Sequence, residues 1–552
     1  MFYAIIKTNF SSFEGMNPML TMYIKNFLSP KIHRILFLIG CAISLCSLPF
    51  SKFTLSIGLF FLTINWLLEG NWRCKALTFI NRKSLWIFLL VYLSVLISFF
   101  YSDNTSFALK ELKLWLPILL IPIVIGTSKP ITNNELKYLF LAFCIAVFVS
   151  SIISLTLFIR DYQTLGQDLR YLSPFVSHIR LSLMVNLSIF ILIFLALKKS
   201  LFISVRIRLL LILLAFWFVL FLFILQSVNG IIILFSVIII VATSWVFKIK
   251  SLVVKILAIT IFVFSLLVTT IYITHAVSSF YHRNTVDFKT LPHITQNGNP
   301  YIHDTLQRQY ENSNLVWINI CSKELIQEWD RLCKLYPSIK GRDYTSIEFG
   351  LIRYLTSKGL NKDSIGVSKL DSVDFKLINN NVSSVIFREH KFGVYPRLYQ
   401  LLWEIDKYRN TNDPNGSTLL QRYIYFKASW AIIKKHILFG VGVGDGQDFL
   451  MDYYSTSNVN LDKQFWFLSH NQYLTIWIAS GLVGLILFIS GLLIPSFIER
   501  KSFNILSIAF LSIILISMLT EDTLETHVGI TFTALFYSFI IFGDNFSLDK
   551  KE

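Results

Sequence analysis

Long apolar runs separated by short polar connections recur along this chain from residue 35 onward. Each run is about long enough to cross a hydrocarbon core of roughly 30 Å as a helix. The runs cover 35–50, 53–69, 85–101, 111–127, 137–159, 179–197, 209–227, 230–247, 252–274, 472–495, 504–519 and 527–543. The pattern predicts an all-α, polytopic membrane protein with about twelve transmembrane helices.

One interval between the runs is much longer than the others. Residues 275–470 separate the ninth run from the tenth, and a connection of that length is either functional or disordered. Its tryptophans and its many Leu, Ile and Tyr residues favour an ordered domain with a small core. Periodic apolar positions predict three helices in it: one capped by Ser322 and running to Leu335, one over Ile347–Leu360 and one over Arg397–Tyr408.

The predicted organisation therefore has three parts. Residues 1–274 form a membrane domain with helices one to nine, residues 275–470 form a mainly helical loop domain, and residues 471–552 return to the membrane as helices ten to twelve. Near its end the loop domain contains an amphipathic helix, Gln421–Phe439, which we expect to lie in the lipid headgroup region. Arg422 projects away from the lysines of this helix, although an interfacial anchor is the alternative explanation for it.

Basic residues alternate between the connections in the way expected of a membrane protein, because short cytoplasmic loops collect Lys and Arg. With the N-terminus inside, the cytoplasmic connections hold Arg73, Lys75, Arg82, Lys83, Lys129, Lys137, Lys198, Lys199, Arg206, Arg208, Lys248, Lys250, Arg500 and Lys501. The opposite loops are acidic or neutral, as at 101–104 and 520–523. The alternation predicts that both termini are cytoplasmic and that 275–470 is periplasmic.

Composition narrows the function classes. The chain is 54% hydrophobic and only 15% charged, which lies outside the range of soluble domains. Its formal net charge of +17 is explained by basic loops that contact anionic membrane lipids. No nucleic-acid motif is present, so we expect membrane lipids and no nucleic acid among its partners.

The long loop has no sign of a disulfide or a zinc site. Cys321 and Cys333 flank one predicted helix and would be about 18 Å apart along its axis, beyond the roughly 7 Å that a disulfide allows. We therefore expect free thiols. The loop histidines lack metal-site spacing: His275, His282, His293 and His303.

Candidate chemistry begins where the long loop meets the tenth run. His470 and Asn471 are followed by nine residues, Gly481, two residues and Gly484. Histidine is suited to proton transfer near neutral pH, although an interfacial histidine without chemistry is the alternative. The two glycines allow a neighbouring helix to approach closely. The earlier stretch Gly440–Gly446 lacks the spacing of a nucleotide-binding loop and is expected to redirect the chain.

These residues resemble the O-antigen ligase and polymerase family of bacterial envelope enzymes. The resemblance rests on Arg422–Gly446, Ser469–Leu474 and Gly481–Gly484, and the His-Asn-x9-Gly-x-x-Gly spacing is that of the ligase branch. The segment Arg353–Asp363 is similar to members from the Bacteroidetes. Twelve helices with a large exported loop between the ninth and tenth match the family's architecture.

The resemblance implies a glycosyltransferase of the inner membrane. It would move a glycan from undecaprenyl diphosphate to an acceptor hydroxyl at the periplasmic face, without a metal or nucleotide cofactor. The ligase-type spacing favours lipid A-core as the acceptor. A polymerase that extends another lipid-linked repeat unit, and a branch that glycosylates protein Ser or Thr, are alternatives within the family.

The resemblance and the chemistry together suggest roles for individual residues. His470 is expected to be the general base that removes the acceptor's proton. Arg422 matches the arginine of the family's amphipathic segment and is expected to bind the diphosphate, since a guanidinium pairs with phosphate oxygens bidentately. Arg180, at the exported mouth of the sixth helix, is the second candidate, because an arginine entering a span is usually functional. Snorkelling to the interface is the alternative for Arg180.

Other residues are expected to support this site. Asn471, Gly481 and Gly484 belong to the motif itself. Glu521 and Glu525 lie in the last exported turn, where the family often has an acidic residue, and would orient an arginine or the acceptor. A solvated loop is the alternative for that turn.

A flippase for the same lipid-linked sugar is the competing class of function. Such transporters usually contain internal repeats and ionisable residues near the bilayer midplane. The sequence has no clear repeat, and its charged residues within apolar runs, Glu111, Lys113 and Arg180, lie near helix ends. We therefore favour the enzyme.

Overall fold

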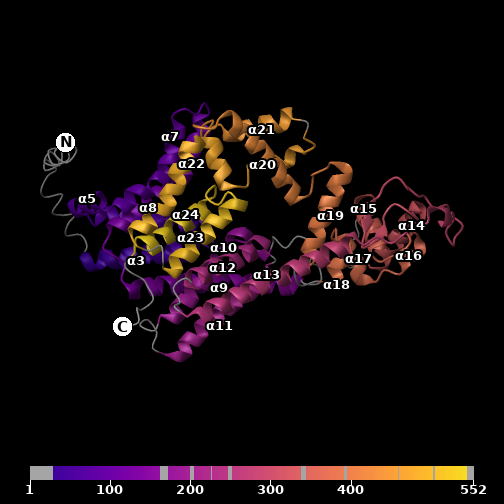
Figure 1. The fold of residues 1–552 in the computed structure, drawn as a ribbon, viewed down its shortest axis with the longest axis horizontal. Coiled ribbons are helices and arrows are strands. Elements are labelled where there is room, and N and C mark those ends of the chain that lie inside the picture. Colours follow the sequence, from indigo (N-terminus) through magenta and orange to yellow (C-terminus); the bar gives the residue numbers. More distant parts are fainter. Residues whose placement is uncertain are drawn as a thin grey trace.

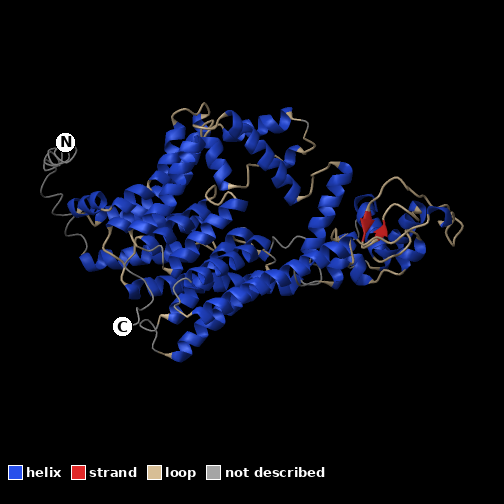
Figure 2. Ribbon diagram, in the orientation of Figure 1, coloured by secondary structure: helices blue, strands red, loops and turns tan. Residues whose placement is uncertain are grey.

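A computed structural model describes residues 29–161, 172–198, 204–225, 227–246, 251–336, 344–390, 395–457, 459–500 and 504–543. Helices make up nearly all of the regular structure in these ranges, with one short hairpin (Figure 2). A helix bundle occupies one part of the molecule, and the loop domain projects from it (Figure 1).

Each of the twelve predicted apolar runs falls on one or more helices. The bundle contains α3 (Pro30–Ser47), α4 (Lys52–Leu68), α5 (Trp72–Asn81), α6 (Lys83–Phe88), α7 (Leu90–Phe99), α8 (Thr105–Thr127), α9 (Asn133–Asp161), α10 (His178–Leu197), α11 (Val205–Ile224), α12 (Val228–Val246), α13 (Leu252–Tyr281), α22 (Gln472–Ile498), α23 (Ile505–Thr520) and α24 (His527–Ile541).

Within the described ranges, five helices are long and apolar enough to cross a membrane: α3, α9, α10, α11 and α22. The number is six if α4 and α5, which meet at a bend of 110°, form one span. The shorter apolar helices include α23 and α24 and the segment Val228–Ser244 of α12. The chain is thus a multi-pass membrane protein, whereas the count of twelve spans stays a prediction.

The core of the bundle is formed by helices that are apolar on every side. All residues of α24 after His527 are buried, and α24 packs against α8 and α23. Most of α10 is buried as well, against α9, α11, α12 and α23. A helix without a polar face has to be surrounded by other helices or lipid, which explains these two central positions.

The helix α13 connects the bundle to the loop domain (Figure 1). It continues to Tyr281, past the predicted boundary at 274, and its 30 residues are about 45 Å long at 1.5 Å per residue. At its end Phe280 packs against Tyr399, with ring centroids 5.3 Å apart, and Arg283 pairs with Asp406 at 3.4 Å. The loop domain is therefore attached through side-chain contacts as well as through the chain.

The loop domain contains η3 (Phe288–Thr290), β1 (Tyr310–Glu311), β2 (Asn314–Leu315), α14 (Ser322–Leu335), α15 (Tyr344–Ser357), α16 (Ser364–Ser368), α17 (Ser372–Asn379), α18 (Ile386–Glu389) and α19 (Tyr395–Thr411). The strands are antiparallel, with Tyr310 opposite Leu315. Trp329, Leu351 and Phe375 are buried in its core. The mainly helical character is as predicted from the sequence.

The three helices predicted in this domain are present with shifted ends. The first begins at Ser322 as predicted, but Cys321 occupies the cap position, so the prediction that Ser322 caps the helix was wrong. All six cysteines are free thiols, as expected for Cys321 and Cys333.

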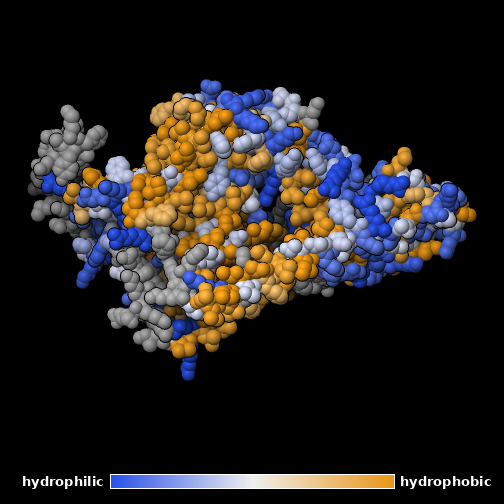
Figure 3. All heavy atoms as spheres, viewed as in Figure 1, coloured by the Kyte–Doolittle hydropathy of each residue, from blue (hydrophilic) through white to orange (hydrophobic). Residues whose placement is uncertain are grey.

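Hydrophobic residues cover the bundle, whereas hydrophilic ones gather on the loop domain (Figure 3).

The predicted amphipathic helix is α20 (Thr418–Lys435), which starts three residues earlier than 421 and stops before 439. It starts at Thr418 because the Ser417 side chain accepts a hydrogen bond from the backbone N–H of Leu420 at 3.3 Å. Lys427, Lys434 and Lys435 are exposed. The chain then passes through α21 (Gly446–Thr456) and η4 (Lys463–Phe465) to α22.

The tenth run is not one continuous helix, because α22 is broken at Gly481. That residue has φ +67°, which side chains other than glycine rarely adopt. The break exposes backbone groups to the segment 437–442: Leu482 donates to the Ile437 carbonyl at 2.8 Å, and Val441 donates to the Ile478 carbonyl at 2.8 Å. The linker that follows α20 is therefore fixed against α22.

Candidate functional site

Four parts of the chain meet at one end of the bundle: the first turn of α10, the residues before α22, the turn between α23 and α24, and the middle of α20. These parts lie near the first residue of α22. At the last residue of α22 there is a second charged cluster, in which Glu499 pairs with Arg82 at 2.8 Å. The 27 residues of α22, which is broken at Gly481, separate these two ends. The charged clusters at the two ends are thus independent of each other.

His470 lies just before α22, with its backbone in the left-handed region at φ +49°. Its side chain is 34% exposed, and Nδ1 lies 3.8 Å from Oε2 of Glu521. One face of the imidazole packs on Tyr425, with ring centroids 5.5 Å apart, and Phe467 contacts it edge-on. The ring is therefore held between aromatic side chains while it remains accessible to solvent.

Glu521 connects His470 to Arg422. The Arg422 guanidinium on α20 forms an ion pair with Oε1 of Glu521, and the other carboxylate oxygen faces His470. Arg422 and Tyr425 are three residues apart, so both project from one face of α20 toward the turn. The two residues thereby reach the same carboxylate and imidazole.

The charge state of Glu521 is set by these neighbours. Burial alone would raise the pKa of Glu521, but the interaction with His470 and the positive charge of Arg422 outweigh it and hold the pKa below its ordinary value. The charge of Arg180 acts in the same direction. Glu521 is therefore an ionised carboxylate near neutral pH.

Arg180 reaches the same turn from α10. Its Nε donates to Oγ1 of Thr526 at 3.1 Å, and its Nη2 donates to the backbone carbonyl of Asp522 at 2.9 Å. The residue is only 8% exposed, and its Nη1 is buried without a hydrogen-bond partner in the described ranges. A buried guanidinium with a free donor is a group that an anion would satisfy.

Asp522 holds the turn in place. Its carboxylate accepts a hydrogen bond from Oγ1 of Thr475 on α22 at 2.7 Å, and burial raises its pKa above the ordinary value. Ser469 lies 3.4 Å from the same carboxylate oxygen. The turn that presents Glu521 is thus connected on one side to α22 and on the other, through Arg180, to α10.

Asn471 caps α22 directly after His470. Its side-chain oxygen accepts from the backbone N–H groups of Tyr473 and Leu474 at 3.0 and 3.1 Å, and its amide donates to the Leu519 carbonyl at 2.9 Å. His470 therefore precedes the cap and is not part of the helix. Asn471 fixes the start of α22 against the end of α23.

The two motif glycines, Gly481 and Gly484, lie within α22 and have different neighbours. A side chain at Gly481 would overlap the backbone carbonyl of Leu438, so Gly481 accommodates the linker, whereas the close approach of a helix was expected. At Gly484 the nearest atom is the hydroxyl of Ser480 within the same helix. Gly481 thus shapes α22 at its break, whereas Gly484 faces the α7 backbone, whose Ser94 carbonyl lies 3.6 Å from the position of an added Cβ.

Among the described residues, Glu525 contacts groups other than the two arginines, and its expected role toward an arginine or the acceptor stays a prediction. Its carboxylate accepts from Nε2 of Gln472 at 2.8 Å and lies beside Glu111 of α8. Burial and the neighbouring charge of Glu111 raise the pKa of Glu525 well above its ordinary value. Both carboxyl groups line a small cavity between α8, α21 and α22, away from Arg422.

In the parts of the chain that the structure describes, no group of three or more His, Cys, Asp or Glu side chains is arranged to hold a metal ion. The site combines an accessible imidazole, a carboxylate beside it and two guanidinium groups directed at one turn. Such a set can remove a proton from a hydroxyl and neutralise negative charge that develops on a nearby phosphate.

Sequence reasoning missed Tyr425, Asp522, Thr475 and Gln472. Asp522 follows Glu521 in an acidic turn that the sequence places opposite the basic loops, so the turn could have been treated as a unit. Tyr425 could have been found from its spacing of three residues to Arg422 on a predicted helix. Thr475 and Gln472 carry no signal, because their roles depend on contacts with a distant segment.

The central motif lies in a segment that matches a known protein family. The family model described as O-antigen ligase matches residues 367–489, less than a quarter of the chain, and this match confirms the resemblance noted from the motifs. The matched segment contains Arg422, His470, Asn471, Gly481 and Gly484, whereas Arg180, Glu521 and Glu525 lie outside it. The match supports glycosyl transfer of the O-antigen ligase or polymerase type in general. A search of curated proteins found no match.

Proposed function

We propose that this protein is a glycosyltransferase of the cytoplasmic membrane that moves a glycan from undecaprenyl diphosphate to an acceptor hydroxyl at the periplasmic face. The observation that carries the proposal is the cluster of His470, Glu521 and Arg422, with the free donor of Arg180 directed at the same turn. The family match includes the histidine and one of the arginines.

In the proposed reaction the acceptor oxygen attacks the anomeric carbon of the donor sugar. His470 takes the hydroxyl proton as the new carbon–oxygen bond forms, and the bond between the anomeric carbon and the diphosphate oxygen breaks. Nδ1 faces Glu521, so Nε2 is the nitrogen available to the acceptor. The carboxylate then stabilises the imidazolium that results.

The diphosphate leaves with the electron pair of the broken bond. Its negative charge is stabilised by the free Nη1 of Arg180 and by Arg422. Because Arg422 is paired with Glu521 in this structure, binding of the diphosphate would make it share its donors between the carboxylate and the phosphate. The proton and the leaving group are thereby handled by neighbouring residues of one cluster.

We propose ligation to lipid A-core as the specific reaction, because the His-Asn-x9-Gly-x-x-Gly spacing is that of the ligase branch. A polymerase of the same family would use the same donor and differ only in its acceptor. The loop domain, which we place in the periplasm, is large enough to contact either one.

The test is transfer by the purified protein with lipid-linked glycan as donor and with lipid A-core or a second lipid-linked repeat unit as acceptor. We expect product with lipid A-core and little with the repeat unit. Product with the repeat unit alone would replace the ligase by the polymerase. If neither acceptor is glycosylated while the protein is folded, the proposed function is wrong.

A further inference from the structure

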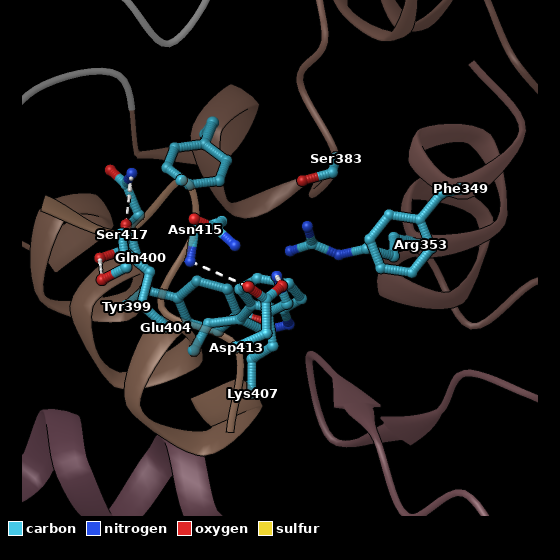
Figure 4. Close-up of a pocket in the computed structure, with 13 residues that line it drawn as sticks. Phe349, Arg353, Ser383, Tyr399, Gln400, Glu404, Lys407, Asp413, Asn415 and Ser417 are labelled. Carbon is cyan, nitrogen blue, oxygen red and sulfur yellow. Dashed lines mark hydrogen bonds and ion pairs between the residues drawn. The ribbon is translucent and has the colours of Figure 1, made fainter. Parts of the chain in front are cut away.

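A cavity of about 250 Å³ lies in the loop domain, between α15, α19 and the segment 413–417 that leads into α20 (Figure 4). It is lined by aromatic and charged side chains together, among them Phe349, Arg353, Trp403, Glu404, Lys407 and Asp413. Its volume is near the lower end of small-molecule sites, which begins at roughly 300 Å³. A ligand that fills it therefore has about one or two rings.

One wall of the cavity is aromatic. The Arg353 guanidinium lies 3.5 Å from the centroid of the Trp403 ring and 5.5 Å from the centroid of the Phe349 ring. No hydrogen bond of the Trp403 indole N–H occurs among the described residues. The Arg353 guanidinium covers one face of the Trp403 indole, so a ligand meets the remaining aromatic surface of Trp403 and Phe349 next to the indole N–H, a combination that suits a ring with one apolar face and polar edges.

The polar groups of the cavity are fixed before any ligand binds. Arg353 donates to Glu311 at 2.8 Å, and Glu311 is 0% exposed. Glu404 accepts from Gln400 at 2.9 Å and from Ser417. Figure 4 shows Arg353 pointing from α15 across the cavity toward Asn415 and Asp413. Preorganised donors and acceptors of this kind lower the entropy lost on binding.

The charges of the cavity are balanced. Arg353 is paired with Glu311, and Lys407 is paired with Asp413 at 2.7 Å. Glu404 adds one further carboxyl group, so no excess of positive charge is present to attract a phosphate or another anion. The site therefore suits an uncharged ligand that is rich in hydroxyl groups.

The cavity is also connected to the residues around His470. Ser417 both lines the cavity and caps α20, and Arg422 follows five residues later, about 7.5 Å along the helix. Asn415 accepts from the backbone N–H of Asp462 at 2.9 Å and thereby contacts the segment that leads to His470. A ligand in the cavity lies against elements that carry the candidate site.

We propose that this cavity binds an uncharged sugar residue of a glycan, with the ring on Trp403 and its hydroxyl groups toward Arg353 and Asn415. Its role rests on the proposed function: the cavity holds part of the donor or acceptor glycan while another part reaches His470. The donor glycan and the acceptor glycan both contain uncharged sugar rings. The KM measured for each substrate shows which of the two glycans the cavity holds.

Binding is tested with the purified full-length chain in detergent on an array of defined glycans, both uncharged and anionic. We expect capture of uncharged glycans, with affinity reduced at least about 10-fold by Trp403→Ala, since truncation of a central aromatic contact costs more than 1 kcal/mol. Ser383→Leu fills the cavity from another side without removing a hydrogen bond and should have the same effect. Ile326→Ala, at an exposed position on α14, is the matched control and should bind normally.

Melting temperatures show whether these variants fold, and Trp403→Phe keeps the aromatic wall as a conservative variant. Absence of capture by the wild type, capture of anionic glycans alone, or full binding by both Trp403→Ala and Ser383→Leu would overturn the proposal. Capture that is lost in both variants and retained in Ile326→Ala supports it.

The role in transfer is measured separately. Trp403→Ala should raise KM for either the donor or the acceptor by about 10-fold while kcat changes little, and the substrate affected identifies the glycan bound. His470→Ala should bind the array like the wild type. A wild type that binds glycans without transferring them would refute the proposed function alone, whereas unchanged KM values in Trp403→Ala would refute the role of the cavity.

Discussion

At the scale of single residues, Glu521 is the centre of the candidate site. One of its carboxylate oxygens pairs with Arg422, and the other faces His470. Its position in a turn connected to α10 and α22 explains why residues from distant parts of the sequence converge on it. Its side chain therefore sets the orientation of the imidazole and of one guanidinium.

The first prediction concerns this carboxylate. Glu521→Gln keeps the shape but removes the charge that stabilises the imidazolium, so we expect kcat to fall by about 100-fold, within the range of acid–base contributions. Because the pKa of Glu521 is depressed, the carboxylate is present above the ordinary value of 4.5 and is lost only as the pH falls through a lower value.

The pH profile of kcat distinguishes this role from a structural one. Activity falls at acidic pH in both proteins, because the base must be unprotonated. The neighbouring carboxylate favours the protonated base, so the acid limb should lie at lower pH in the Gln variant than in the wild type. Glu389→Gln, at an exposed position in the loop domain, is the control and should behave like the wild type. Equal profiles for Glu521→Gln and the wild type would contradict the assignment.

The second prediction concerns Arg180. Arg180→Lys retains the charge but removes the fork that contacts Asp522, Thr526 and the proposed phosphate. We expect KM for the lipid-linked donor to rise by about 10- to 100-fold, since a hydrogen bond to a charged group contributes about 1.5–3 kcal/mol. Arg331→Lys, an exposed arginine on α14, should leave it unchanged. A donor KM equal to that of the wild type would assign Arg180 a purely structural role.

The sequence pointed to His470, Arg422, Arg180 and Glu521, because their chemistry matches a motif or is unusual at a membrane face. The sequence did not show that Glu521 and Glu525 have different contacts, since both lie in one acidic turn. Only the packing shows that Glu521 faces Arg422 whereas Glu525 faces Gln472 and Glu111. Side-chain direction in a turn has no periodicity from which it could be read.

At the scale of elements, the broken helix α22 positions the site. Its first part carries the Asn471 cap, and its break at Gly481 receives the linker that follows α20. The relative placement of Arg422 and His470 therefore depends on the hydrogen bonds between 437–442 and the kink.

The third prediction follows from this contact. Gly481→Ala forces a side chain into the left-handed backbone region, which costs about 1–3 kcal/mol, and against the Leu438 carbonyl. We expect a lower melting temperature in detergent together with a large loss of transfer. Gly484→Ala should be milder, because its backbone is not in the left-handed region and the added Cβ meets the Ser480 side chain and not backbone atoms at that distance. The reverse order of the two variants would contradict the role given to the kink.

The fourth prediction concerns the loop domain. Lys362 is buried, and burial lowers its pKa from 10.5 to about 8. The unfolded state therefore binds more protons between pH 8 and 10.5, so stability should rise with pH over that window. Lys362→Met removes the buried charge and should raise the melting temperature at pH 7 and abolish the rise. A variant that is less stable than the wild type at pH 7 would show that the lysine is required for folding.

Helix positions were predictable because apolar runs and periodic patterns persist over many residues. Cap positions and the kink were not, since they depend on one or two dihedral angles. Cys321 in place of Ser322 as the cap of α14, and the left-handed Gly481 within an apolar run, are the two clearest cases.

At the scale of the whole molecule, the charged residues lie at two ends of the bundle. Arg82 pairs with Glu499 at one end of α22, and His470 lies before the other end. The alternation of basic loops predicts such a separation, with the proposed site on the exported face. The number of spans does not follow from the apolar runs alone, because α23 and α24 are short helices and α4 and α5 meet at a sharp bend.

The central claim is that His470 removes the acceptor's proton from within a cluster that also binds the lipid diphosphate. The most direct measurement is a single turnover: lipid-linked donor is bound to the purified protein, acceptor is added, and bound donor and product are followed together. We predict that the wild type converts its bound donor, and that His470→Ala retains the donor with a transfer rate lower by at least about 100-fold. His436→Ala, at the end of α20, should react like the wild type. Conversion by His470→Ala at the wild-type rate would contradict the account.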